Sequence, residues 1–393
     1  MKYILFFVLV FSIHSSITAQ KGMPAKQVVN INHTTNYPQH VDFAASMVND
    51  LKVAPGWKIT AAATGLGKPR MLYMGSKGQL YVTRRDQGDV LMLTDKDADN
   101  KFDDMLAVVA DFPGVHGITI HDGWMYLVSN RVMKRFQVKE DGTVGVMQEL
   151  YNDLPDGGQH GNRTMEFGPD GKLYLSVGST CNDCGETNKE NATMLQIDPT
   201  TWKRTIYARG LRNTIGFDWH PATKELWGID NGGDAKGDNW PPEEVNMIPK
   251  DGDLGWPLVY GKQVVDETRE DPPGTTKAAY AKTTVASVLE APAHSAPIAF
   301  RFFGSANVSA DYKNDGLVCW HGSWNRKDPS GYKVSRIKFV NGKAAGMEDF
   351  VTGFLSPDKR TRMGRPAGLI VSGEGKVYIS DDANGVIYCV TQQ

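Results

Sequence analysis

The stretch RTMEFGPDGKLYLSVGS at residues 163–179 decides the fold of this chain. It contains an apolar-alternating strand, a Pro-Asp-Gly turn and a second strand, LYLSVG, which is the pattern of a β-hairpin. The pattern recurs, and the other copies begin at residues 70, 116, 215, 298 and 367, the one at 298 being the loosest. Repeats in which each copy is one such unit are typical of a β-propeller. The six copies therefore predict an all-β fold, a six-bladed β-propeller.

The rest of the chain is assigned around these repeats. Residues 57–62 (WKITAA) are expected to supply the strand that closes the ring with the last blade. Residues 20–50 lack strong periodicity and are expected to form an N-terminal extension packed on the outside. The tract at about 261–292, rich in Pro, Lys and Thr, is interpreted as an inserted loop or lid between blades four and five. The propeller would then occupy residues 51–393.

The chain begins with MKYILFFVLVFSIHSSITAQ. Lys2 gives a positive start, an apolar run follows, and small residues end at Ala19, which is the pattern of a secretory signal peptide at residues 1–19. An uncleaved anchor is the minor alternative. No other stretch of the sequence has the uninterrupted apolar length of a membrane-spanning helix. We therefore expect a periplasmic or secreted protein with no membrane span after cleavage.

Charge and cysteine content narrow the functional classes. With 43 basic and 45 acidic side chains, the chain lacks the basic surface that nucleic-acid binding needs. In an exported protein Cys181 and Cys184 could close a small disulfide, and because no histidine follows them they are not a c-type haem site. Cys319 and Cys389 lie in apolar sequence and are expected to be buried.

Polar residues recur near the starts of the expected inner strands, where a six-fold arrangement would bring them to one face. They include His160 in a Gly-rich turn, a residue type easily poised as a base near neutral pH. The others are His116, Arg212, Asn213, residues 231–234, residues 321–326 and Arg365. Cations clustered in a channel need a counter-anion. The pattern therefore indicates a planar, anionic ligand held by arginines.

Two acidic tracts leave alternatives open. Glu243, Glu244 and Asn246 either bind a cation or cap a strand at the surface, and their spacing favours the surface. Residues 95–103 resemble the beginning of an EF-hand loop, but with Asn100 at position six and Leu106 at position twelve. This tract is either a weak calcium loop or a solvated turn between blades, with equal weight.

Ten motifs in order carry a resemblance to a known family: LPDGGQHGNR, FGPDGKLYLSVGSTCNDC, ARGLRN, LWGIDNGGD, PPEEVN, GDLGWP, AHSAP, HGSWNR, GRPAG and SDDANG. From about residue 65 to 390 the chain resembles the soluble glucose/L-sorbosone dehydrogenases that use pyrroloquinoline quinone (PQQ). The resemblance implies a six-bladed propeller that binds PQQ and calcium. It also implies a small-molecule sugar or aldehyde substrate oxidised by hydride transfer, and a separate electron acceptor, either a cytochrome or a quinone.

The resemblance also assigns roles to individual residues. His160 would be the general base that takes the hydroxyl proton of the substrate. The calcium ion would act as a Lewis acid on the quinone. The residues implied to bind these groups are Arg212, Asn213, Arg365 and either Asn325 or Arg326 for PQQ, and the backbone carbonyls of Gly232 and Gly233 for calcium.

One position departs from the family pattern. In glucose-oxidising members an acidic residue orients the histidine, and here that position is Ser179. A serine cannot stabilise an imidazolium as a carboxylate does, although Asp183 or Glu186 would be available to substitute. The departure favours the sorbosone dehydrogenase-like branch. The alternatives are a non-redox propeller that binds glycans or a protein, and a calcium-dependent lactonase or hydrolase in which His160 activates water.

Overall fold

The computed structural model describes residues 34–304 and 306–393. The predicted signal peptide, at residues 1–19, lies outside the described residues. The longest helical segment in the described part of the chain is a six-residue 3₁₀ helix, η1 (Ala45–Asp50). Within those same residues no helix combines the length and apolar character needed to cross a membrane.

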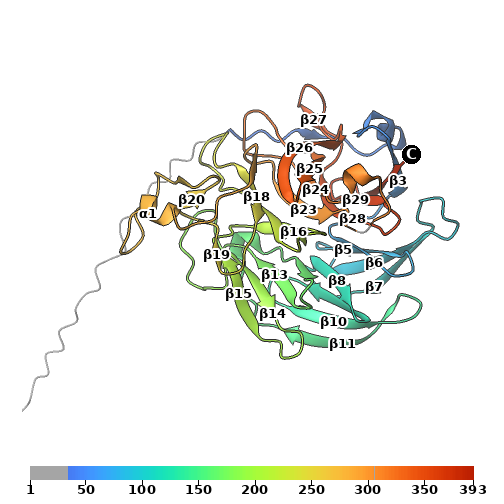
Figure 1. Cartoon of the computed structure of the whole chain (residues 1–393). Helices are drawn as coiled ribbons and strands as arrows, with labels where there is room; N and C mark the ends of the chain where they lie inside the picture. The colour runs from blue at the N-terminus through green and yellow to red at the C-terminus, as the bar shows by residue number, and fades with distance from the viewer. Residues whose placement is uncertain (1–33, 305) are drawn as a thin grey trace, which may run out of the picture.

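Six antiparallel sheets stand around a central axis as the blades of a propeller (Figure 1), which confirms the predicted fold. Each blade has four strands, with a fifth short strand added at the outer edge of blades three and five, and each of the six sequence repeats forms the two inner strands of one blade.

The strands of the first three blades, from the axis outward, are β4 (Leu72–Met74), β5 (Leu80–Arg84), β6 (Asp89–Thr94) and β7 (Asp104–Val109); β8 (Gly117–His121), β9 (Trp124–Val128), β10 (Met133–Val138) and β11 (Val144–Tyr151); and β12 (Met165–Phe167), β13 (Leu173–Val177), β14 (Thr193–Ile197) and β15 (Arg204–Arg209). Those of the last three are β16 (Thr214–Trp219), β17 (Leu226–Asp230), β18 (Glu243–Met247) and β22 (Leu289–Ala291); β23 (Pro297–Phe302), β24 (Gly316–Trp320), β25 (Lys333–Val340) and β26 (Lys343–Thr352); and β28 (Pro366–Val371), β29 (Val377–Asp381), β30 (Val386–Gln392) and β3 (Trp57–Ala63).

The ring is closed by strands from opposite ends of the described chain. β3 pairs antiparallel with β30 as the outermost strand of blade six, and Figure 1 shows the blue β3 beside the red C-terminal strands. The strand expected at residues 57–62 therefore closes the ring, as predicted from the sequence. Blade six is therefore complete only when both ends of the ring are paired.

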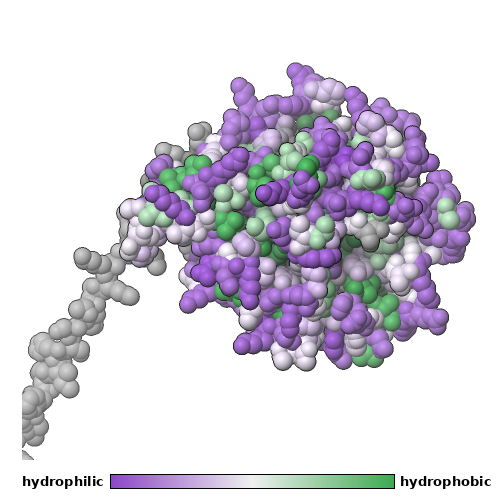
Figure 2. Space-filling model, in the orientation of Figure 1, coloured by the Kyte–Doolittle hydropathy of each residue, from purple (hydrophilic) through white to green (hydrophobic). Residues whose placement is uncertain are grey.

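Burial within a blade explains why the inner strands are so apolar. Every residue of β13 (LYLSV) is buried, because neighbouring blades cover both faces of a strand near the axis. The outermost strands β7 and β11 are largely exposed instead. On the side drawn in Figure 2, hydrophilic residues predominate and hydrophobic ones form separate patches.

A buried apolar cluster lies at the innermost strands of the propeller. Met71, Ile118, Ile215 and Ile298 belong to one buried cluster and come from the innermost part of four blades. Of these, Ile215 and Ile298 also line a cavity. These two side chains therefore form an apolar floor of that cavity.

The described part of the N-terminal extension packs against blades five and six. β1 (Gln39–His40) pairs in parallel with β27 (Thr361–Arg362), a strand in the connection between those blades. β2 (Lys52–Val53) pairs with β26 at the outer edge of blade five. Between them Phe43, Met47 and Val48 pack against the hydrophobic core that the two blades share.

The long tract expected between blades four and five lies within blade four. Its chain leaves β18 and returns as β22, which pairs with β18 as the fourth strand of that blade. The intervening segments are β19 (Gly252–Asp253), β20 (Val259–Tyr260), β21 (Val264–Val265) and the helix α1 (Lys277–Ala281). α1 and β20 project from the ring at the left of Figure 1.

Candidate active site

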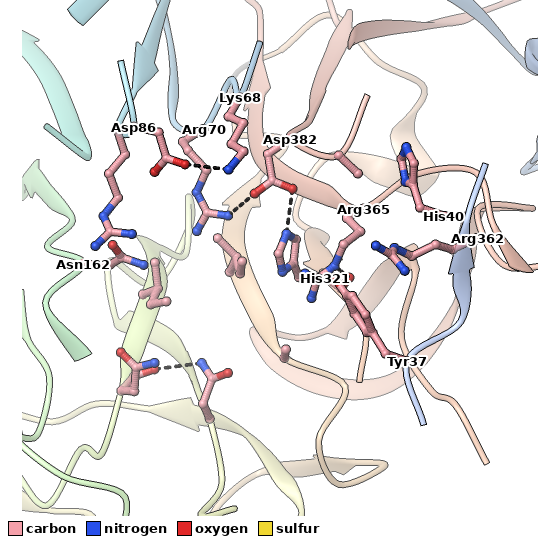
Figure 3. A pocket seen from close by; sticks show the side chains of 17 residues that line it. Tyr37, His40, Lys68, Arg70, Asp86, Asn162, His321, Arg362, Arg365 and Asp382 are labelled. Atoms are coloured by element: carbon pink, nitrogen blue, oxygen red, sulfur yellow. Dashed lines mark hydrogen bonds and ion pairs between the residues drawn. The ribbon is translucent and has the colours of Figure 1, made fainter. Parts of the chain in front are cut away.

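A cavity of about 640 Å³ opens above the apolar floor. Its walls come from the loops that lead into or out of inner strands, with Arg70 from blade one, Asn213 from blade four and Arg365 from blade six. Tyr37 of the N-terminal extension also lines it (Figure 3). Residues far apart in the sequence thus meet at one end of the propeller axis.

The cavity is strongly cationic. Five basic side chains line it and two carboxylates, Asp86 and Asp382, face them. The basic residues are Lys68, Arg70, Arg85, Arg362 and Arg365. Arg85 is exposed, and no hydrogen bond or ion pair of its guanidinium is found among the described residues. An anionic ligand would supply the missing negative charge.

Arg70, Asp382 and His321 form a hydrogen-bonded chain in the wall, with side chains 10–15% exposed (Figure 3). One carboxylate oxygen of Asp382 lies 2.5 Å from Nη1 of Arg70, and the other lies 2.8 Å from Nε2 of His321. Burial lowers the pKa of His321 to about 4, although Asp382 opposes this. The nearby His321, Arg70 and Arg365 hold the pKa of Asp382 well below its usual range, against the effect of burial. Asp382 is therefore a fixed anion that orients two neighbours.

His160 is held by a serine rather than by a carboxylate. It ends the short 3₁₀ turn η2 (Gly158–His160), and its Nδ1 lies 2.8 Å from Oγ and 3.0 Å from the carbonyl oxygen of Ser179. The Ser179 hydroxyl donates its own hydrogen to the carbonyl of Cys181. Both oxygens therefore accept from Nδ1–H, which leaves Nε2 of His160 as the basic nitrogen.

The electrostatic surroundings keep the His160 ring neutral. Burial lowers its pKa to about 3, and the positive charge of Arg212 acts in the same direction. The residues proposed to replace the missing carboxylate lie elsewhere: Asp183 accepts from Nζ of Lys236 at 2.6 Å, and Glu186 accepts from Thr180. Neither carboxylate contacts His160, so Ser179 is the group that positions its ring.

Two residues assigned to the cofactor from the sequence line the cavity. These are Asn213 and Arg365. Arg365 donates through Nη1 to the Tyr37 hydroxyl at 2.7 Å, and through Nε and Nη2 to the carbonyls of His321 and Gly322, both at 3.0 Å. Its guanidinium is thus fixed in place.

Other assigned residues tie loops together beside the cavity. Arg212 is 2% exposed and donates to the backbone and side chain of Asn182, to the carbonyl of Asn231 and to Asp234. Asn325 donates to Asp234 at 2.6 Å. Arg326 donates to the carbonyl of Ala293 and to the side chain of Asn239. None of these three lines the cavity, and neither do His160, Gly232 and Gly233. The structure therefore gives Arg212, Asn325 and Arg326 a role in loop support.

The Gly232–Gly233 turn lies in an oxygen-rich setting. A Cβ on Gly232 would lie 2.8 and 2.9 Å from the carbonyl oxygens of Pro242 and Pro241, so this close approach requires glycine. The Gly232 amide donates to Glu243. Among the described residues, the carbonyl oxygens of Gly232 and Gly233 accept no hydrogen bond. Free carbonyl oxygens of this kind suit a calcium ion.

The interpretation of Glu243, Glu244 and Asn246 as a surface cap is wrong. All three are buried in β18, with exposures of 2%, 6% and 1%. Glu243 accepts from the amides of Gly232 and Ala296, which ties the glycine turn to the next blade. Burial raises the pKa of Glu243 and of Glu244 to about 8. A strand whose neighbours cover both faces buries even its carboxylates.

The cysteines and the second acidic tract are not among the residues that line the cavity. Cys181 and Cys184 form a disulfide, and Cys319 and Cys389 are buried as predicted. Residues 95–103 form a loop within blade one, between β6 and β7, rather than between blades. Carboxylate oxygens of its first three aspartates lie within 4.8 Å of one another, and calcium binding by this loop stays a prediction.

Sequence reasoning did not single out Tyr37, Lys68, Arg70, Arg85 or Asp382. Lys68 lies just before the first repeat, Arg70 is the first residue of that repeat, and Arg85 follows its second strand. Arg212 and Arg365 were noted because they lie at the ends of repeats, and these three residues lie at the ends of a repeat too. The same sequence pattern could therefore have identified them. Tyr37 had no such signal because its contact with the cavity depends on pairing between β1 and β27.

A family model described as TrAA12-like matches residues 51–246 and 244–393. Among curated relatives, a pyrroloquinoline quinone-dependent pyranose dehydrogenase of Coprinopsis cinerea is 24% identical over 408 residues, covering 86% of this chain and 54% of the relative. A pyrroloquinoline quinone-dependent sugar dehydrogenase of Hypocrea jecorina is 23% identical, covering 92% of both chains. An uncharacterized protein of Borreliella burgdorferi is 36% identical over 223 residues, 56% of this chain and 57% of that protein. The chain thus spans little more than half the length of two of these three relatives.

Solved structures show the same fold. The family AA12 protein of Trichoderma reesei superposes with a TM-score of 0.76 at 22% identity, covering 92% of this chain and 100% of that one. The holo form of the PQQ domain of the Coprinopsis cinerea pyranose dehydrogenase also gives 0.76, at 21% identity over 91% and 100% of the two chains.

Proposed function

The chain belongs to the TrAA12-like family, and on that premise we propose that it is an exported, PQQ-dependent dehydrogenase that oxidises a sugar. The observation that carries the proposal is the cavity itself, where five cations face two carboxylates above an apolar floor. PQQ is a flat tricarboxylate. Its carboxylates match the cations, and its ring system matches the apolar floor.

The cavity residues fit this cofactor in charge and in position. Lys68, Arg70, Arg85 and Arg365 line the wall and would hold the carboxylates of PQQ, while Ile215 and Ile298 would lie beneath its rings. Gly232 and Gly233 would hold calcium through carbonyl oxygens that accept no hydrogen bond within the described chain. When bound, PQQ supplies a quinone that accepts a hydride from the substrate, and calcium polarises that quinone.

His160 is the general base in this proposal. Ser179 fixes the tautomer with the proton on Nδ1, so Nε2 is free to take the hydroxyl proton of the substrate. A base with a pKa of about 3 is weak, and Arg212 contributes to that weakness. The carboxylates of a bound cofactor would offset this positive charge and make Nε2 more basic.

The proposed setting is the periplasm or the outside of the cell. The signal-peptide pattern at residues 1–19 supports export, and the Cys181–Cys184 disulfide is typical of oxidising compartments. The electrons would pass to a separate acceptor, a cytochrome or a quinone. For the substrate we propose an aldose in its pyranose form. Sorbosone is the alternative, an aldehyde substrate, against which the aldoses are tested.

A titration with PQQ tests the proposal. The purified protein is loaded with calcium and titrated with PQQ by calorimetry, and reduction of an artificial acceptor is then followed with a panel of aldoses and sorbosone. We expect saturable binding and turnover that depends on PQQ. Absence of PQQ binding would contradict the dehydrogenase, and hydrolysis of a lactone without any acceptor would favour the lactonase instead.

A further inference from the structure

The N-terminal segment at residues 34–41, here called the strap, runs along the cavity, which it lines with Tyr37 and His40. Its backbone and side chains bond to three separate loops. The amide of Thr34 lies 3.4 Å from Oδ1 of Asp238, and Asn36 donates to the carbonyls of Trp324 and Lys327 at 3.0 and 2.8 Å. Further along, β1 pairs with β27. The strap is therefore anchored on both sides of Tyr37.

Tyr37 is clamped between two arginines of the cavity. Its hydroxyl accepts from Nη1 of Arg365 at 2.7 Å, and the Arg362 guanidinium lies 3.9 Å from the centre of its ring. Arg362 also donates to the carbonyl of Pro38. Figure 3 shows the Tyr37 side chain reaching toward the cavity wall beside Arg365. The ring is held before any ligand arrives, so a ligand would not bear the cost of ordering it.

Exposure places Tyr37 at the outer layer of the cavity. Ile215 and Ile298 in the floor are 4% and 5% exposed, the His321 side chain in the wall is 12% exposed, and Tyr37 at the rim is 45% exposed. A flat anion held by the wall cations would lie between floor and rim. The next molecule to enter would then lie against Tyr37.

We propose that Tyr37 is a stacking platform for the pyranose ring of the substrate. The C–H face of a pyranose is apolar, and an aromatic ring held in one orientation offers it a large contact area. Arg362 lies over the ring of Tyr37 and Arg365 donates to its hydroxyl, and these two contacts fix the orientation of the ring. This inference rests on the proposed sugar dehydrogenase function and makes Tyr37 a determinant of its specificity.

The test compares three variants. Tyr37→Ala removes the ring, Tyr37→Phe keeps it, and Val41→Ala is a matched control on the same strap, outside the cavity lining and 36% exposed. With PQQ and calcium bound, we expect Tyr37→Ala to raise KM for pyranoses about tenfold or more, with kcat and PQQ affinity within about twofold. Tyr37→Phe and Val41→Ala should stay within about threefold of the wild type.

A binding measurement separates this inference from the proposed function. The probe is 1,5-anhydro-D-glucitol, a pyranose without the anomeric hydroxyl, followed by saturation-transfer NMR on the PQQ-loaded and PQQ-free protein, with thermal melting as a check on folding. Loss of probe binding in Tyr37→Ala alone supports the platform. Unchanged probe binding, or a loss of PQQ affinity with unchanged KM, overturns it. Failure of the wild type to bind PQQ contradicts the proposed function, whereas the probe still reports on Tyr37.

Discussion

Two histidines at this end of the propeller are held in contrasting ways. His160 bonds to the hydroxyl and carbonyl of Ser179, both of which are neutral. His321 bonds to the carboxylate of Asp382, which also binds Arg70. A carboxylate stabilises a positive imidazolium, whereas a serine fixes only the tautomer and the orientation. The contrast indicates that His160 is free to exchange a proton and that His321 belongs to a rigid charged wall.

The largest effect should come from removing the proposed base, His160. We expect His160→Ala to lower kcat by about 10² to 10⁴, the usual contribution of a general base. His321→Ala, the matched control, should reduce PQQ affinity more than kcat at saturating cofactor. Steady-state kinetics with excess PQQ and calcium give both values. An equal loss of kcat in His321→Ala would reverse the roles of the two histidines.

The next effect concerns the charged wall. Asp382→Asn would leave Arg70 buried without its ion-pair partner, and loss of one partner of a buried pair costs about 3–5 kcal/mol of stability. Denaturant unfolding of the cofactor-free protein measures the difference. Asp122→Asn, at an exposed carboxylate beside His121, should change stability by less than about 0.5 kcal/mol. Similar values for the two variants would show that the Asp382 network is not structural.

A substitution of Ser179 by aspartate should give His160 a carboxylate partner, as His321 has in Asp382. Ser179→Asp would place a negative charge beside Nδ1 of His160 and raise the histidine pKa from about 3. The base is inactive when protonated, so the acid limb of kcat/KM against pH should move upward by about one unit or more. Ser179→Ala should leave the limb in place. An acid limb that does not move in Ser179→Asp would show that the acid limb does not report the protonation of His160.

A further effect, on stability against pH, is shared by both histidines and by His116. Burial lowers their pKa values to about 3, 4 and 3 for His160, His321 and His116, from an ordinary value of 6.5. Below pH 6.5 the unfolded chain therefore binds protons that the folded protein does not. We expect the free energy of unfolding to fall as the pH drops from 6.5 toward 3. Denaturant unfolding at pH 7 and pH 5 checks this, and greater stability at pH 5 would contradict it.

The sequence predicted the fold well because a propeller is built from local units. Each hairpin lies within one repeat, so the turn at residues 169–171 and its counterparts mark the blades directly. The contact between His160 and Ser179 could also be anticipated, since the resemblance places residue 179 where the histidine's partner belongs. These features depend on residues that are close in the chain or on a recognised motif.

The remainder of the site depends on contacts that no local pattern records. Arg70 meets Asp382 across 312 positions of sequence, and Arg365 meets Tyr37 across 328. Glu243 and Glu244 suggest a solvated surface by their residue type, yet the neighbouring strands and loops of the ring bury them. Charged residues in a central blade strand follow the packing of the ring rather than their own hydropathy.

The seam between β3 and β30 has a consequence for the order of events in biosynthesis. The ring cannot close until β30 has emerged from the ribosome, because β30 is the only strand of that sheet with which β3 pairs. Arg70 and Asp382 face each other from the first and the last blade, so the cationic wall forms only with that closure. Any cofactor held by this wall must therefore be acquired after β30 has been synthesised, by a propeller whose ring is already closed.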